Sequence, residues 1–179
     1  ACKGADALIA VSQPGPDIVK PSWIKAMGSK PIVFACANPV PEIYPYAAKE
    51  AGAYIVATGR GDFPNQVNNS LGFPGILKGA LLVRARKITD EMAITAAYSM
   101  ANYAQKKGLT PDYIMPKMDQ TEMFAYEAAD VAMEAIKNGV ARIKLDHDTV
   151  VKQTLADIKL TRDTIDMMMA NSLIQRPDD

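Results

Sequence analysis

The sequence predicts an α/β fold, in which part of a doubly wound parallel sheet is followed by C-terminal helices. Short, continuous apolar runs alternate closely with helical segments up to about residue 57, and after a long polar loop only helical patterns follow. Continuous apolar runs are typical of parallel strands that are buried on both faces. Strands that alternate with helices at short spacing favour a parallel sheet with helical crossovers.

Three strands are expected, at residues 7–11, 32–37 and 53–57. Turn residues stop the first run at Ser12 and Gln13, and Asn38 with Pro39 stops the second. The short helices between the strands are expected at residues 18–27 and 45–51, the second of them closed by Gly52. These elements make up the predicted sheet and its crossovers.

The later part of the chain is expected to be helical, at residues 76–84, 90–107, 121–137 and 148–173. The second of these helices has the clearest signals, because Thr89 can cap its start and Lys106, Lys107 and Gly108 suit its end. The boundary between the sheet-forming domain and a helical tail is placed between residues 145 and 146, which gives parts 1–145 and 146–179.

Composition narrows the class of protein. The chain has 179 residues and a formal net charge of +0 from 20 basic and 20 acidic side chains, so no footprint of nucleic-acid or acidic-membrane binding is visible. No apolar run approaches the roughly 18 residues that cross a bilayer. The two cysteines, Cys2 and Cys36, cannot form a disulfide framework, which favours a reducing compartment, either the cytoplasm or an organelle matrix, and we expect a cytoplasmic location. The first residues lead directly into a strand and suggest the middle of a fold.

The loop at residues 58–75 is the strongest functional signal. Connections are usually about 4 to 6 residues long, so a much longer loop rich in glycine, proline and asparagine favours a binding role. Pro74 and Gly75 stand where the next helix begins, and the positive end of that helix suits an anionic ligand. Asn68 and Asn69 offer neutral amides that can hold a carboxylate. The alternative is that these asparagines only satisfy the loop backbone.

Several ordered motifs resemble segments of the malic enzymes. They are Ala37-Asn38-Pro39, Pro41-Glu42-Ile43, Asn65-Gln66-Val67-Asn68-Asn69, Phe73-Pro74-Gly75-Ile76, Gly79-Ala80, Lys87 to Met92, and Ile114 to Asp119. The resemblance extends to about Ile143. It implies that residues 1–145 are the C-terminal portion of a Rossmann-like NAD(P)-binding domain.

The resemblance also implies an activity. Malic enzymes oxidatively decarboxylate malate to pyruvate and carbon dioxide, with NAD or NADP as cofactor and Mg or Mn as the divalent metal. The family's catalytic tyrosine and lysine, its metal ligands and its glycine-rich dinucleotide loop precede the segment present here. No catalytic residue or metal ligand is therefore expected in this chain, which should be inactive alone, and the complete protein should be a homo-oligomer, either a dimer or a tetramer.

In open parallel sheets the ligand lies at the carboxyl ends of the strands, where three loops of this chain would meet. By resemblance, substrate would contact Asn38, Asn68 and Asn69, and cofactor would contact Ser12, Gln13, Pro14, Gly15, Asn38 and Asn69. The sequence does not distinguish NAD from NADP.

Two other hypotheses about the function of the chain stay open. The segment at residues 11–15 also resembles the corresponding turn of folate-linked dehydrogenases, although that family leaves the Asn-Asn and Phe-Pro-Gly motifs unexplained. The chain could also be a non-catalytic nucleotide-binding or interaction module whose long terminal helix docks a partner.

Overall fold

A computed structural model describes residues 2–177 and divides the chain into two compact units. The sheet unit comprises residues up to Gly72 together with Met100–Gln120. The helical unit comprises Phe73–Ser99 and the chain from Thr121 onward.

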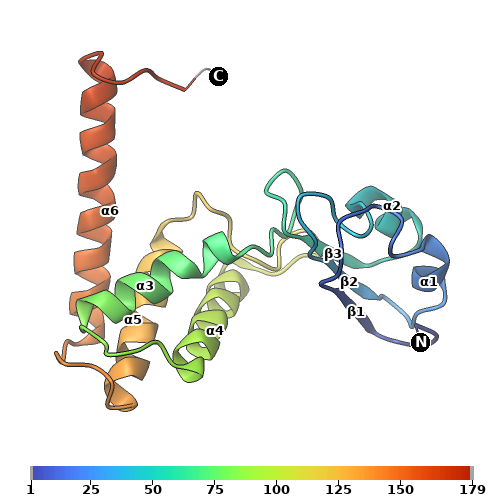
Figure 1. The fold of residues 1–179 in the computed structure, drawn as a ribbon, viewed down its shortest axis with the longest axis horizontal. Helices are drawn as coiled ribbons and strands as arrows, with labels where there is room; N and C mark the ends of the chain where they lie inside the picture. The colour runs from blue at the N-terminus through green and yellow to red at the C-terminus, as the bar shows by residue number, and fades with distance from the viewer. Residues whose placement is uncertain (1, 178–179) are drawn as a thin grey trace. The chain divides into compact units, whose positions relative to one another are not determined.

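The sheet unit contains three parallel strands in the order β1-β2-β3 (Figure 1). Their bounds are β1 Ala7–Ala10, β2 Ile32–Ala35 and β3 Ile55–Thr58, and the crossovers contain α1 Pro21–Lys25 and α2 Pro45–Glu50. The register pairs the last residues of the strands, Ala10 with Ala35 and Ala35 with Thr58. The predicted α/β class and parallel sheet are confirmed, and the three strands end level with one another.

The apolar core of the sheet unit lies on one face of the sheet. Val33, Ala35 and Val56 are buried there together with Ile24 of α1 and Ala48 of α2. The expectation that the first strand is buried on both faces is wrong for the described residues. Ile9, on the opposite face of β1, is 71% exposed, because nothing in the described chain covers that face of the strand.

Helix α1 is shorter than the sequence predicts. It begins at Pro21, and Lys20 before it is extended, with ψ of 139°. A residue that precedes proline is held out of the helical region, so the helix cannot extend back to Ile18. Val19, in the segment before the helix, is nevertheless buried in the core.

The later elements follow the predicted order. They are the 3₁₀ turn η1 Asn69–Leu71 in the sheet unit, then α3 Phe73–Leu82, α4 Asp90–Lys107, α5 Glu122–Lys137 and α6 His147–Ala170. Helix α3 starts at Phe73, which places Pro74 in its first turn, where a missing N–H costs nothing. The predicted cap of α4 is confirmed, because the backbone N–H of Met92 donates to Thr89 Oγ1 at 3.3 Å.

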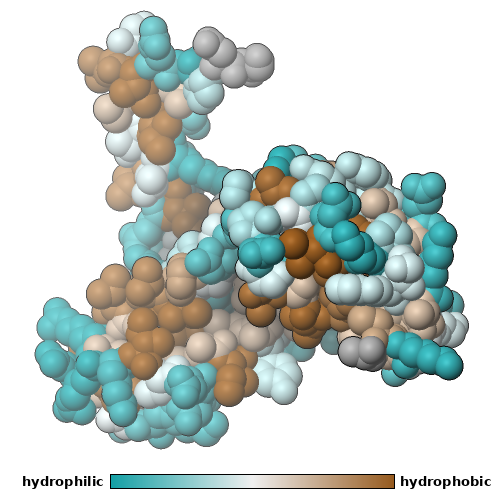
Figure 2. Space-filling model, turned by 45° about the vertical axis from the view of Figure 1, so that its right-hand side comes forward, coloured by the Kyte–Doolittle hydropathy of each residue, from teal (hydrophilic) through white to brown (hydrophobic). Residues whose placement is uncertain are grey.

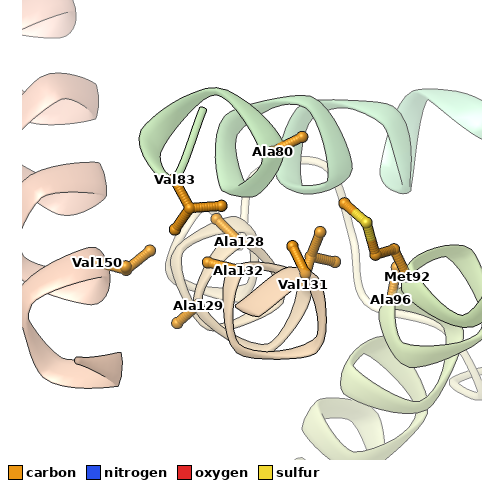
Figure 3. Packing of buried hydrophobic residues seen from close by; sticks show 10 residues of the cluster. Ala80, Val83, Met92, Ala96, Ala128, Ala129, Val131, Ala132 and Val150 are labelled. Carbon is orange, nitrogen blue, oxygen red and sulfur yellow. The ribbon is translucent and has the colours of Figure 1, made fainter. Parts of the chain in front are cut away.

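Helices α3 and α5 form the centre of the helical unit (Figure 3). Ala80 of α3 and Val83, directly after this helix, pack with Ala128 and Ala132 of α5, and all four are buried. The contact is close at Gly79, where an added Cβ would lie 2.4 Å from the carbonyl oxygen of Ala128. A glycine is required there because any side chain would separate the two helices.

The first turns of helix α6 contribute the buried residues of this helix. Val150 joins the core of α3 and α5, and Thr154 is also buried. Leu160 is 66% exposed, and hydrophobic residues are visible on the outer part of this helix in Figure 2. Within residues 2–177, no helix combines the length and apolarity needed to span a bilayer.

Candidate functional site

The loops after β1, β2 and β3 meet at the carboxyl edge of the sheet, because the ends of the three parallel strands are in register. Asn38 from the loop after β2 lies against Gly59 directly after β3. A Cβ added at Gly59 would stand 2.9 Å from both Nδ2 and Oδ1 of Asn38. The glycine therefore leaves room for the amide of Asn38 over the main chain, and the structure brings these two loops together as predicted.

Asn38 itself is exposed at this edge, and its side chain makes no hydrogen bond to the described chain. Its amide can therefore both donate to and accept from a ligand.

A buried carboxylate, Glu42, joins the first two loops. Glu42 Oε1 accepts hydrogen bonds from the backbone N–H of Ser12 at 2.8 Å and from Ser12 Oγ at 3.0 Å. Its Oε2 accepts a hydrogen bond from the backbone N–H of Ala37 at 3.0 Å. Glu42 is 0% exposed, so one side chain links the chain after β1 to the chain after β2.

The charge of Glu42 is stabilised by these donors. Burial raises the pKa of its carboxyl group, but hydrogen bonds from the Ala37 and Ser12 backbone, from its own backbone and from the Ser12 hydroxyl outweigh burial and hold the pKa below its usual range. Glu42 is therefore an anion at neutral pH. The same charge contributes, after burial, to a raised pKa of the nearby Cys36 thiol.

The predicted cofactor loop after β1 lies at the surface. Gln13 and Pro14 are exposed, as is Ser12. Gly15 has φ of 149° and donates its backbone N–H to the carbonyl oxygen of Val40 at 3.3 Å. This loop is thus tied to the Val40–Glu42 turn at both of its ends, while its middle remains open to a ligand.

The two asparagines of the central loop differ in their surroundings. Asn68 Nδ2 donates to the carbonyl oxygen of Gly59 at 2.9 Å, and Asn68 Oδ1 accepts from the backbone N–H of Ser70 at 2.9 Å. Asn69 is exposed, and its side chain has no hydrogen bond to the described residues. The Asn68 side chain therefore anchors the loop through one donated and one accepted hydrogen bond, whereas all donors and acceptors of the Asn69 amide are available to a ligand.

Asn65 has an anchoring function that sequence reasoning missed. Its φ is 55° and it is 5% exposed. Nδ2 donates to the carbonyl oxygens of Val56 at 3.0 Å and Pro111 at 2.8 Å, and Oδ1 accepts from the N–H of Ile114 at 2.8 Å. Asparagine is among the few residues that tolerate a positive φ, which is the only sequence signal that could have marked it.

The central loop is also fastened on its outer side. Arg60 donates to both carboxylate oxygens of Asp62, at 2.8 and 2.7 Å, and to the carbonyl oxygen of Pro39 at 3.0 Å. A cavity of about 610 Å³ lies between residues 61–66 of this loop and the connector at residues 112–119. Arg60, Gly61 and Asp62 are thus part of an internally paired turn.

Among residues 2–177, no group of three or more His, Cys, Asp or Glu side chains is placed to hold a metal ion. The exposed loop after β1, the free amide of Asn38 and the main chain of Gly59 leave a polar surface at this edge of the sheet.

The sequence profile of the family described as "Malic enzyme, NAD binding domain" matches residues 5–138. The bifunctional malic/malolactic enzyme of Bacillus subtilis is 45% identical over 150 residues, which cover 84% of this chain and 36% of the relative. The NAD-dependent malic enzyme of Geobacillus stearothermophilus is 45% identical over 139 residues, covering 78% of this chain and 28% of the relative.

Solved structures agree with the sequence comparisons. The crystal structure of the malic enzyme from Entamoeba histolytica matches with a TM-score of 0.96 and 61% identity, over 99% of this chain and 37% of that one. The chain therefore covers only 28% to 37% of the length of these three relatives. A folate-linked dehydrogenase is not favoured by these matches. On the profile, the identities and the shared fold, the chain belongs to the malic enzyme family and contains part of its NAD-binding domain.

Proposed function

We propose that the complete protein oxidatively decarboxylates malate to pyruvate and carbon dioxide, with NAD or NADP as cofactor and Mg or Mn as the metal. The observation that carries this proposal is the carboxyl edge of the sheet, where Asn38, Gly59 and the loop after β1 converge in a chain of the malic enzyme family. The cofactor, when bound, supplies the acceptor for the hydride that leaves C2 of malate.

This chain contributes binding groups. Ser12, Gln13, Pro14 and Gly15 form the surface on which the cofactor lies, and the small, open loop lets its ring approach the main chain. Asn38 serves both cofactor and substrate, because its free amide has donors and an acceptor at the edge.

The central loop completes the substrate side. Asn69 holds a carboxylate of malate, or the cofactor amide, with its unengaged side chain. Asn68 supports the same loop and has one N–H left for substrate after its bond to Gly59. Neutral amides suit a dicarboxylate, because they add no negative charge that would repel it.

The chemistry of proton transfer and metal binding is assigned to the remainder of the protein. The described residues gather no metal-ligand cluster. We place residues 1–145 in the NAD(P)-binding domain and residues 146–179 in a helical tail, and the 179-residue chain alone is then inactive. The complete protein is a cytoplasmic homo-oligomer, dimer or tetramer, without nucleic-acid or membrane partners.

The test is malate-dependent reduction of NAD and, separately, NADP by the complete protein in the presence of Mn²⁺. Turnover that requires malate, metal and one of the two cofactors is the expected result, and it names the cofactor. The 179-residue chain, checked by intact mass, should give no turnover. Absence of malate-dependent reduction in the complete protein would overturn the proposed reaction, and turnover by the short chain would overturn the placement of the catalytic groups.

A further inference from the structure

We propose that Glu42 is a positioning residue for the nicotinamide cofactor: its buried carboxylate holds the loop after β1 and the loop after β2 in one fixed arrangement. This inference rests on the proposed function, because those loops carry Ser12 and Asn38, which are assigned to cofactor there. Glu42 does not itself touch the cofactor in this proposal.

The division of the hydrogen bonds shows that the carboxylate serves both loops at once. Oε1 receives two donors from Ser12, and Oε2 receives the N–H of Ala37. Both backbone donors lie two positions beyond the last residue of a strand, Ala10 in β1 and Ala35 in β2. Here the regular ladder has ended, and a backbone N–H needs another acceptor.

Glu42 is itself held firmly. Its carbonyl oxygen accepts the backbone N–H of Val19 at 3.0 Å, and the next residue, Ile43, is 1% exposed in the core. The two loops are therefore both hydrogen-bonded to a residue whose backbone is fixed by the packed interior of the sheet unit. Groups held in this way need little ordering when a ligand binds.

A carboxylate is the side chain this position requires. A glutamine has one acceptor oxygen, so its Nε2 would face the N–H of either Ser12 or Ala37, and two donors would oppose one another. Aspartate keeps the charge but is one methylene shorter, and it cannot reach both loops from the same backbone. Removing the carboxylate therefore releases at least one loop while the sheet and its core remain.

The experiment compares four variants of the complete protein: Glu42→Gln, Glu42→Asp, Ile43→Val and Glu50→Gln. Dissociation constants for NAD and NADP are measured by titration calorimetry, and KM and kcat are measured where malate turnover is present. Ile43→Val removes a buried methylene next to Glu42 in the chain and controls for lost stability. Glu50→Gln makes the same chemical change at an exposed position of α2.

The expected result is a split between binding and turnover. Glu42→Gln raises the dissociation constant and KM of the cofactor by about tenfold or more, because displaced loops no longer meet it, while kcat at saturating cofactor stays within about threefold. Glu42→Asp gives a smaller rise. Ile43→Val and Glu50→Gln leave cofactor binding unchanged, even where Ile43→Val lowers the melting temperature as much as Glu42→Gln does.

Other results overturn the inference. One is unchanged cofactor binding in Glu42→Gln, with hydrogen exchange showing that the amides of Ser12 and Ala37 have lost protection. Another is an equal loss of binding in Ile43→Val, which would assign the effect to stability. If Glu42→Gln does not fold, Glu42→Asp must still weaken cofactor binding while Ile43→Val does not. A wild-type protein that binds cofactor but does not oxidise malate refutes the proposed reaction and leaves this comparison intact.

Discussion

The carboxyl group of Glu127 on α5 occupies the space in which a side chain at Gly75 of α3 would lie. A Cβ added at Gly75 would stand 2.1 Å from Glu127 Oε2. Glu127 is 0% exposed, and neither of its carboxyl oxygens has a hydrogen-bond partner among residues 2–177. Burial raises the pKa of Glu127 to about 8, so the group is mostly protonated at neutral pH.

Replacing Gly75 with alanine should destabilise the protein by about 1 to 3 kcal/mol, because the new methyl group overlaps the carboxyl of Glu127. The sign is informative. At an unconstrained helical position the same change should stabilise by roughly 0.5 to 1 kcal/mol. Urea denaturation followed by circular dichroism measures the difference.

The double variant Gly75→Ala with Glu127→Ala serves as the control for this clash. It should lose less stability than the sum of the two single changes, because the space vacated by the carboxyl accepts the methyl group. Strict additivity, or a stabilised Gly75→Ala protein, would mean that the two residues do not compete for this space.

The pH dependence of stability should report the buried carboxyl of Glu127. Its folded pKa of about 8 lies above the ordinary value of 4.5. The native state therefore binds more protons than the unfolded state between these values, and stability falls as pH rises through that window. A shift of this size corresponds to a loss on the order of 5 kcal/mol, complete only above the folded pKa.

Glu127→Gln removes this titration. The variant and the wild type should have similar free energies of unfolding near pH 4.5, and the variant should become progressively more stable than the wild type up to about pH 8. Glu122→Gln, at an exposed position in the first turn of the same helix, is the matched control. A difference between Glu127→Gln and wild type that does not vary with pH would show that Glu127 is ionised or solvated in the native protein.

The sequence predicted those features that depend on local chemistry. Helix α4 is the clearest case, because Thr89 and Gly108 mark both of its ends within the segment itself. The parallel sheet could be predicted from continuous apolar runs. The exposure of Ile9 in β1 could not be predicted, because it depends on what covers the sheet and not on the strand's own residues.

Local sequence patterns could not predict which residues anchor the loops. Glu42 contacts Ser12, 30 positions earlier in the chain, and Asn65 contacts Pro111, 46 positions later. Such pairs become visible only when the fold brings distant segments together. The sequence placed Asn38 at the carboxyl edge, because an asparagine that ends a parallel strand must lie there, whereas it did not separate the tethered Asn68 from the open Asn69.

Asn65 should be an important stability determinant of the sheet unit. Asn65→Gly keeps access to the φ of 55° but removes the hydrogen bonds to Val56, Pro111 and Ile114. The buried groups left without partners should lower the free energy of unfolding by about 2 to 3 kcal/mol. Asn65→Ala should cost about 1 kcal/mol more, because alanine is strained at a positive φ.

The difference between these two variants isolates the backbone term for Asn65. Equal stability of Asn65→Ala and Asn65→Gly would show that the loop relaxes to a negative φ. Stability of both within about 0.5 kcal/mol of wild type, the range of an ordinary surface change, would contradict the anchoring role.

Alanine at Asn68 and at Asn69 should have opposite consequences in the complete protein. Asn69→Ala removes an exposed amide with no internal hydrogen bond, so stability should stay within about 0.5 kcal/mol of wild type. Its KM for malate should rise or its turnover fall by about tenfold, because a hydrogen bond to a charged carboxylate contributes about 1.5 to 3 kcal/mol.

Asn68→Ala should instead lower stability by about 1 kcal/mol, since it removes the cap of η1 and the bond to the Gly59 carbonyl. Asn68→Asp separates the two bonds, because the carboxylate retains the cap to the N–H of Ser70 but cannot donate to Gly59. Its negative charge should also repel a dicarboxylate that lies nearby. Steady-state kinetics and urea denaturation on all three variants give the comparison, and normal malate kinetics in Asn69→Ala would remove that residue from the substrate site.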